Sequence, residues 1–361
     1  MAKGWRVLVL SRYERLGAST RQRVLQYLPF LERAGAQVVV SSFFDDRYLS
    51  HLYSTQRRRL ADVVGAYLRR AHAVLQARHF SLIWLQKELF PYLPASIEGL
   101  LSRIGVPYAV DYDDAVFHTY DQHRSPLARR ILGGKFSKVL ASAQLVTVGN
   151  SYLEDYVRTH GARAVEMVPT VVDTLSYDAA AEPSTTEFRI GWIGSPATSK
   201  YLFLVREALT ALSASRKIRL VTIGAPTLRD YGVPLEQHEW SESTEAQLLG
   251  GIHVGIMPLP DDPWERGKCG YKLIQYMACG RPVVASPVGA SKDIVTQEVG
   301  YLAQWTEDWV QALRVLADDA PRRRFCGSAA RALVERKYSL ERTAPRVVQL
   351  LREASCRGCP D

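Results

Sequence analysis

The residues best suited to chemistry surround the start of a helix that the sequence predicts over 271–278. Lys268 and Lys272 lie four residues apart at this point, and Gly270 allows the backbone to approach a ligand closely. The free N–H groups at a helix start carry partial positive charge. A diphosphate is the natural guest for such a site, although an ordinary helix start with two solvated lysines fits the pattern equally well.

A second loop of the same kind precedes this one in the chain. Residues 189–194 form a predicted strand that ends in glycine, and Ser195, Thr198 and Lys200 follow where a helix begins. Hydroxyl groups and a lysine at a helix start again suit a phosphate. A plain helix cap explains the pattern less well here, because two such loops occur in one predicted domain.

An acidic cluster follows the strand predicted over 107–110. Asp111, Asp113 and Asp114 are crowded together, and such carboxylates repel one another unless something offsets their charge. They could bind Mg²⁺, orient the hydroxyl groups of a substrate, or cap a following helix. His118 lies just beyond them.

Polar residues near the N-terminus form another candidate site. Ser19, Thr20 and Arg21 begin the first predicted helix, where they could grip a phosphate or carboxylate. A capped helix with surface arginines is equally consistent with this pattern. Lys87 follows the end of a predicted strand, so it could face a ligand or simply pair with Glu88.

Alternating strands and helices must position these residues. The order strand, loop, helix, strand at the N-terminus is typical of a Rossmann-like unit, and the same alternation restarts at Phe188. The first loop holds only Gly17 in place of a three-glycine fingerprint, so no dinucleotide cofactor is indicated. The predicted parts of the chain are a domain at 1–173, a linker at 174–187, a domain at 188–338, and a C-terminal helix and tail at 339–361.

Composition fits two ordinary domains. The 361 residues are 47% hydrophobic, and neither a signal peptide nor a membrane-spanning run is expected. Five cysteines without regular spacing indicate a reducing cytoplasm, and Cys356 with Cys359 fits a chance pair better than a redox or metal motif.

Positive charge is concentrated in the first half of the chain. Of the net charge of +9, +8 falls in residues 1–175. This asymmetry indicates attraction to an anionic surface or substrate, with a merely solvated basic face as the alternative. The sequence has no nucleic-acid-binding motif.

The segment GKCGYKLIQYMACGRPVVASPVG, residues 267–289, resembles the nucleotide-sugar-binding core of family 4 (group 1) glycosyltransferases, which have the GT-B fold. The likeness is long and continuous. Family members carry Glu-x7-Glu here, whereas this chain has Gly267 and Gln275 at the two positions. Glu265 or Asp262 could replace the first carboxylate, and Gln275 could still bind a ribose.

The resemblance implies an α/β fold of two Rossmann-like domains that face each other across a cleft, with a C-terminal helix that crosses back to the first domain. The implied donor contacts are Ser195, Lys200, Lys268, Gly270, Tyr271 and Lys272 for the diphosphate and Gly224, Trp240 and Gln275 for the nucleoside. The expected reacting residues are Asp111, Asp114 and His118, and the expected acceptor contacts are Ser19, Thr20, Arg21 and Lys87. Neither a metal nor a cofactor is implied.

The leading interpretation is a retaining glycosyltransferase that moves a sugar from a nucleotide-diphosphate-sugar to an acceptor hydroxyl. The expected acceptor is a glycan or a lipid-linked molecule in cell-surface glycan, lipopolysaccharide or glycolipid synthesis. The protein is expected in the cytoplasm, peripheral on the inner membrane face, with no nucleic-acid partner. The alternative is a non-catalytic nucleotide-sugar-binding protein or partner subunit, which the missing carboxylates favour. Epimerase or phosphorylase chemistry is a third interpretation, and the sequence offers no cofactor-binding lysine context for a phosphorylase.

Overall fold

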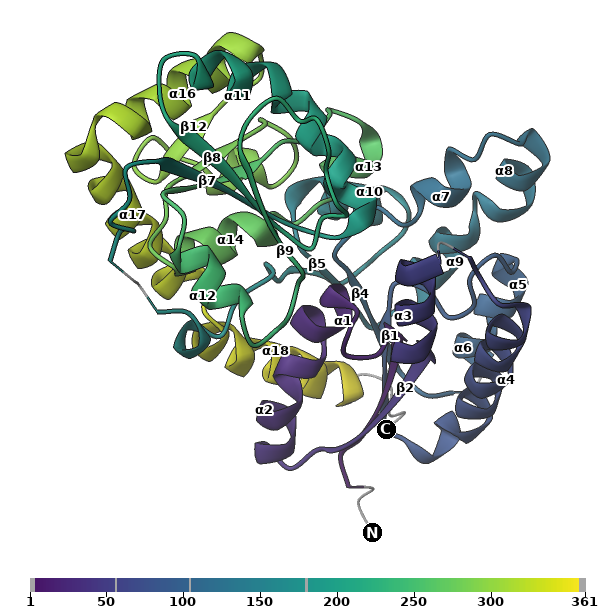
Figure 1. Cartoon of the computed structure of the whole chain (residues 1–361). Helices are drawn as coiled ribbons and strands as arrows, with labels where there is room; N and C mark the ends of the chain where they lie inside the picture. The colour runs from purple at the N-terminus through teal and green to yellow at the C-terminus, as the bar shows by residue number, and fades with distance from the viewer. Residues whose placement is uncertain (1–3, 56, 104, 179–180, 357–361) are drawn as a thin grey trace. The chain divides into compact units, whose positions relative to one another are not determined.

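The computed structural model describes residues 4–55, 57–103, 105–178 and 181–356 (Figure 1). The chain divides into two compact units. The first unit comprises residues 1–170 and 343–361, and the second comprises residues 171–342. Each unit contains a six-stranded sheet whose consecutive strands are joined through helices or loops.

The sheet of the first unit has the strand order β2-β1-β3-β4-β5-β6, and every pair is parallel. Its middle strands are apolar runs that are buried along their whole length, as both faces of a parallel sheet require. The strands are β1 (Arg6–Tyr13), β2 (Gln37–Phe44), β3 (Leu82–Gln86), β4 (Tyr108–Tyr112), β5 (Leu145–Val148) and β6 (Val165–Met167).

The helices of the first unit are mostly short. They are α1 (Ala18–Arg23), η1 (Leu25–Tyr27), α2 (Leu28–Arg33), α3 (Asp46–Thr55), α4 (Leu60–Gln76), η2 (Ala77–His79), α5 (Ala95–Glu98), α6 (Leu100–Arg103), α7 (His118–Asp121), α8 (Pro126–Leu132), α9 (Lys135–Ser142) and α10 (Ser151–Thr159), where η marks a 3₁₀ helix.

The sheet of the second unit has the order β12-β11-β10-β7-β8-β9, again with parallel pairs. Its core is a cluster of buried side chains that includes Trp192, Leu220 and Ile256. The strands are β7 (Phe188–Ile193), β8 (Ile218–Ile223), β9 (Leu235–His238), β10 (Val254–Met257), β11 (Val283–Ala285) and β12 (Gly300–Leu302).

The helices of the second unit are η3 (Thr174–Ser176), η4 (Pro196–Val205), α11 (Arg206–Ser213), α12 (Glu245–Gly250), α13 (Pro263–Arg266), α14 (Tyr271–Ala278), α15 (Ser291–Ile294), α16 (Thr306–Asp318) and α17 (Ala320–Lys337). The last helix, α18 (Leu340–Cys356), begins in the second unit, and its residues from Thr343 onward belong to the first.

Each sheet has a point at which the chain reverses the direction in which it adds strands. In the first unit this point lies between β1 and β3, and in the second it lies between β7 and β10. Ligands of open parallel sheets bind beside the carboxyl ends of the strands at such a switch point. Ligands are therefore expected at the loops after β1, β3, β7 and β10.

Two helices differ from what the sequence pattern alone predicts. The pattern predicts one long helix over 55–78, whereas in the structure α3 ends at Thr55 and α4 begins at Leu60. The pattern also predicts one helix over 127–140, which the structure divides into α8 and α9 at Gly133 and Gly134, because glycine in a helix interior is unfavourable.

Candidate functional site

Helix α14 lies beside the switch point of the second unit. Its residue Tyr276 holds the helix there, because the Tyr276 hydroxyl forms hydrogen bonds with both β7 and β10. The Tyr276 hydroxyl donates to the backbone oxygen of Ile256 at 3.2 Å and accepts from the backbone N–H of Ile193 at 2.9 Å. A Cβ at Gly255 would lie 2.1 Å from the Tyr276 ring, so only glycine allows the helix to approach β10 this closely.

The first residue of α14 is preceded by Gly270, which has a φ of 68°. A Cβ at this position would lie 2.5 Å from Cδ1 of Ile294. Glycine is therefore required twice, for its backbone conformation and for the lack of a side chain. The result is a tight turn at the start of α14, and the anion site expected there stays a prediction.

Lys272, on the first turn of α14, contacts the loop after β7. Its Nζ is 3.4 Å from the Thr198 hydroxyl oxygen and 4.3 Å from the centre of the Trp192 ring. Burial, with a smaller effect from Lys268, lowers the pKa of Lys272 to about 7. Lys272 is half-buried, and the positive charge of Lys268 further disfavours its charged form, so a negatively charged group bound here would be favourable.

In the loop after β7, the hydroxyl groups are better placed for the expected anion site than Lys200 is. Ser195 precedes η4, and the Thr198 hydroxyl donates to the backbone oxygen of Ser195 at 3.1 Å. Lys200 is exposed, and its Nζ lies 5.1 Å from the centre of the Tyr201 ring. The structure therefore brings Ser195, Thr198 and Lys272 together, whereas the diphosphate contact expected of Lys200 stays a prediction.

Two of the three residues expected to contact a nucleoside, Trp240 and Gln275, meet at a buried carboxylate that sequence reasoning missed. Glu245, the first residue of α12, accepts hydrogen bonds from Trp240 Nε1 at 2.6 Å and from Gln275 Nε2 at 3.1 Å. It also accepts from the hydroxyl of Tyr177 at 2.5 Å. In the sequence, Glu245 reads only as an acidic residue at a helix start.

This carboxylate network explains why Gln275 suits its position. Its amide donates to both Glu245 and the Tyr177 hydroxyl, at 3.1 Å each. A glutamate there would place a second carboxylate beside Glu245 in a buried site. Tyr177 comes from the stretch expected to be a linker, and Tyr271 Oη lies 3.5 Å from the Tyr177 hydroxyl oxygen. Gly224, which has a φ of 78°, places its backbone beside Trp240.

The two candidate replacements for the first missing glutamate have different environments. Glu265, in α13, is buried and accepts a hydrogen bond from the hydroxyl of Tyr201. Asp262 is exposed at the residue before the same helix. Because a buried carboxylate is already held in one orientation, Glu265 is the better candidate for binding a substrate hydroxyl.

The first unit has its own polar cluster at the switch point between β1 and β3. The Ser19 hydroxyl donates to Asp113, and Gln86 Nε2 donates to the Ser19 oxygen at 3.0 Å. The Thr20 hydroxyl donates to Gln86 Oε1 at 2.9 Å. Lys87, directly after β3, lies 3.1 Å from Asp113 and 2.9 Å from Asp114. Gln86, which forms hydrogen bonds with both Ser19 and Thr20, was not among the site residues predicted from the sequence.

Charge balance holds this cluster together. Burial alone would lower the pKa of Lys87, but Asp113 and Asp114 raise it well above its usual value. Burial raises the pKa of Asp113 against the opposing effect of Lys87. Lys87 has a φ of 67°, which is rare for a residue with a side chain, and such backbone strain is concentrated at functional sites. Of the two alternatives for Lys87, a simple pair with Glu88 is not what the structure shows, since its partners are the two aspartates.

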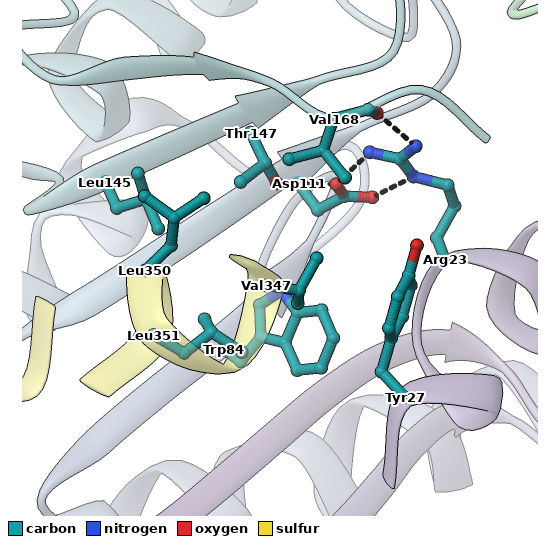
Figure 2. A pocket seen from close by; sticks show the side chains of 10 residues that line it. All are labelled: Arg23, Tyr27, Trp84, Asp111, Leu145, Thr147, Val168, Val347, Leu350 and Leu351. Atoms are coloured by element: carbon teal, nitrogen blue, oxygen red, sulfur yellow. Dashed lines mark hydrogen bonds and ion pairs between the residues drawn. The ribbon is translucent and has the colours of Figure 1, made fainter. Parts of the chain in front are cut away.

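Asp111 is separated from the other two aspartates by its contacts. Arg23 donates to both of its oxygens, at 3.0 Å and 2.6 Å, and also donates to the backbone oxygen of Val168 (Figure 2). The hydroxyl of Thr147 donates to Asp111 at 2.6 Å. Side chains of α18, including Val347, line a cavity of about 10 Å³ together with this ion pair (Figure 2). This environment favours a structural role for Asp111 over the expected catalytic one.

Two further candidates lie apart from the Lys87 cluster. Arg21 donates to the backbone oxygen of Arg15 at 2.8 Å. His118 has both ring nitrogens engaged, with Asp121 at 2.8 Å and with the Tyr152 hydroxyl at 2.7 Å. The catalytic role of His118 stays a prediction, and its hydrogen bonds fix the orientation of the ring.

Among the described residues, no group of three or more His, Cys, Asp or Glu side chains could hold a metal ion. Over the same part of the chain, no helix is long and apolar enough to cross a membrane. Cys356 is an exposed free thiol, and Cys359 lies outside the described residues.

Residues 187–319 match the family model described as "Glycosyl transferases group 1". The matched residues lie in the second unit and include the motif at 267–289, whose resemblance to group 1 glycosyltransferases the match supports. No curated protein sequence matches the chain.

Solved glycosyltransferase structures share the whole two-unit architecture. HepE of Anabaena, in complex with UDP and glucose, is 15% identical with a TM-score of 0.72, over 97% of this chain and 100% of HepE. Sucrose-phosphate synthase of Thermosynechococcus elongatus is 16% identical with a TM-score of 0.73, over 98% of this chain and 100% of that enzyme. WaaG, a glycosyltransferase involved in lipopolysaccharide biosynthesis, is 13% identical with a TM-score of 0.70, over 96% of this chain and 99% of WaaG. These likenesses confirm the predicted GT-B fold.

Proposed function

We propose that this protein is a retaining, metal-independent glycosyltransferase of family 4 that uses a nucleotide-diphosphate-sugar as donor. The observation that carries the proposal is the position of Lys272. It lies at the switch point of the second unit, next to Thr198 and the start of α14, with its pKa lowered to about 7 by burial and by Lys268. A diphosphate bound there would restore the full charge of Lys272 and accept hydrogen bonds from the loop.

The same contacts would assist bond cleavage. Negative charge grows on the diphosphate as it leaves the sugar, and fixed cationic groups stabilise such charge most when water is excluded. Lys272, Lys268 and the backbone of residues 270–272 supply these groups. We assign Glu265 to the donor sugar and the Glu245–Gln275 pair to the nucleoside, because both carboxylates are buried and already oriented.

The first unit would bind the acceptor. Lys87, Asp113 and Asp114 form a cluster in which carboxylates are held ready to accept hydrogen bonds from a hydroxyl group, and Ser19 extends it. We place Asp114 closest to the acceptor, because its side chain is 27% exposed whereas that of Asp113 is 11% exposed. A lipid-linked or glycan acceptor at an anionic membrane surface fits the positive charge of this half of the chain.

A donor panel tests the proposal. Thermal unfolding is followed with UDP-, GDP-, ADP- and dTDP-sugars, UDP-sugars first because HepE was solved with UDP-glucose. A ligand that binds only the folded state must raise the unfolding midpoint at concentrations well above its Kd. We expect one donor class to stabilise the wild type and Lys272→Met to lose the effect. Lys217→Met, which changes an exposed lysine of the same unit, is the control.

The absence of both Glu-x7-Glu carboxylates supports one competing function, a nucleotide-sugar-binding protein without transfer activity. Stabilisation by a donor together with no release of nucleoside diphosphate, in the presence of membrane lipid and glycan extracts, would favour this second function. A panel in which no donor stabilises the protein would contradict both.

A further inference from the structure

Helix α4 carries an apolar stripe that points away from its own unit. Leu60, Val64, Leu68 and Leu75 are 78%, 51%, 67% and 73% exposed. Their spacings of four, four and seven residues place them on one face of the helix. Ala61 and Ala71 are exposed on the same face. These six residues, here called the α4 stripe, extend for about 22 Å at 1.5 Å per residue.

The stripe is not needed to hold α4 in place. The opposite face of the helix carries buried residues that include Ala66, Ala73 and Val74, and α4 contacts β2. The buried Arg70 donates to the backbone oxygen of Ser11 from this face. A helix normally turns its leucines inward and its polar residues outward. Here two alanines, a valine and an arginine are buried whereas the leucines face outward, so the stripe has the character of a contact surface.

A neighbouring strand extends the apolar surface. β2 is the edge strand of the sheet, and its Val39 and Val40 are exposed. A surface groove of about 860 Å³ lies between this strand and α4, with Val39 and Leu68 in its lining. Arg69 and His72 also line the groove, so the apolar surface has a basic border.

The charges around the stripe have one sign. Residues 57–79 include six arginines and a single acidic residue, Asp62. Arg57, Arg58 and Arg59 are exposed immediately before the helix, and Arg78 is exposed just after it. Asp62 is two residues from Leu60, or about 200° around the helix, and so points away from the stripe.

We propose that the α4 stripe and its flanking arginines dock on an anionic lipid bilayer, with α4 lying in the plane of the interface. An amphipathic helix with leucines on one face and cations beside them binds in this way, through apolar burial and attraction to acidic headgroups. The one-sided positive charge argues for a lipid surface rather than a second copy of this chain, because two such faces would repel each other. The inference rests on the proposed function only in that a lipid-linked acceptor gives the docking a purpose.

Vesicle co-sedimentation tests the docking. We expect the full-length protein to bind vesicles of phosphatidylglycerol and phosphatidylcholine, to bind phosphatidylcholine vesicles far less, and to lose affinity as salt rises. Leu68→Ser with Leu75→Ser, and separately Arg57, Arg58 and Arg59→Gln, should each weaken binding by about tenfold or more. Leu175→Ser, at an exposed leucine of the second unit, is the matched control and should bind as the wild type does.

Each outcome bears on one proposal. Equal binding of wild type and stripe variants, or no binding by the wild type, would overturn the docking surface. A dimeric wild type that becomes monomeric when the stripe is changed, measured by light scattering, would overturn it in favour of a second copy. The donor-induced shift of the unfolding midpoint should be the same in the stripe variants and the wild type. Its absence from the wild type would overturn the proposed function and leave the vesicle result intact.

Discussion

At the scale of single residues, the two candidate sites depend on buried charges, most of which are matched by groups of opposite charge. Lys272 in the second unit differs, since the charged group that most affects its pKa is another lysine, Lys268. The first unit shows the opposite arrangement, in which Lys87 is matched by two aspartates. This contrast supports the proposal that the second unit binds an anion.

Nucleoside diphosphate binding should weaken above pH 7. The folded chain holds Lys272 with a pKa of about 7, below its ordinary value of 10.5, and a bound diphosphate would raise that pKa again. Binding therefore takes up a proton above pH 7, and affinity should fall by up to about tenfold per pH unit from there. Calorimetry in buffers of different ionisation enthalpy measures the proton uptake. The same slope in Lys272→Met would show that another group is responsible.

Restoring the family's second glutamate should destabilise this chain. Gln275→Glu would place two carboxylates in contact at a buried position, at a cost of about 1–3 kcal/mol in the free energy of unfolding. Adding Glu245→Gln should recover most of the loss, because one carboxylate and one amide are present again. Denaturant unfolding of the single and double variants measures both effects. A single variant as stable as the wild type would contradict the buried network.

Asp111 and Asp114 should differ in their effect on stability. Asp111→Asn leaves the buried Arg23 without its full counter-charge, and breaking a buried ion pair costs roughly 3–5 kcal/mol. Asp114→Asn changes a partly exposed residue whose partner Lys87 keeps Asp113, so the effect should stay within about 1 kcal/mol. Equilibrium unfolding of the two variants separates the roles. Asp111→Asn with unchanged stability would return Asp111 to the list of catalytic candidates.

At the scale of elements, the turn before α14 sets the geometry of the donor site. Gly270→Ala introduces a Cβ at a φ of 68° and against Ile294, so it should cost at least about 1–2 kcal/mol of stability. It should also weaken donor binding by displacing the first turn of α14. Gly134→Ala is the control in the other unit, since a Cβ there meets no atom within 4 Å. Equal effects of the two changes would argue against a strained turn.

Sequence reasoning found the elements whose signals are local. The two glycine-containing loops and the strands that precede them are visible in short stretches, and the structure places Thr198 and Lys272 together as the two loops suggested. The long-range partners have no such signal. Arg23 and Asp111 are 88 residues apart, and Glu245 and Gln275 are 30 apart. Three adjacent aspartates read as one cluster, because the sequence does not show which of them an arginine would neutralise.

Helix boundaries were the least predictable feature, for a physical reason. The stretch before Leu60 contains few helix-breaking residues, so periodicity alone extends the helix toward residue 55. The outward-facing leucines of α4 are likewise invisible without the fold. Periodicity reveals an apolar stripe on the helix, but it does not show whether that stripe faces the sheet or the solvent.

At the scale of the whole molecule, the two units have different proposed roles. The second unit contains the segment that matches the group 1 glycosyltransferase model and the proposed anion site, and its charge is nearly balanced. The first unit carries most of the net positive charge, the Lys87 cluster and the α4 stripe. Because two units can unfold separately, stability changes are best assigned with a probe from each.

The central claim is that Lys272 binds the diphosphate of a nucleotide-sugar donor, and titration calorimetry tests it most directly. The nucleoside diphosphate of the stabilising donor is titrated into wild type, Lys272→Met and Lys217→Met at pH 7. Loss of a charge-assisted contact of about 1.5–3 kcal/mol predicts a Kd raised at least about tenfold in Lys272→Met and unchanged in Lys217→Met. Equal Kd values for Lys272→Met and wild type would contradict the assignment of the donor site.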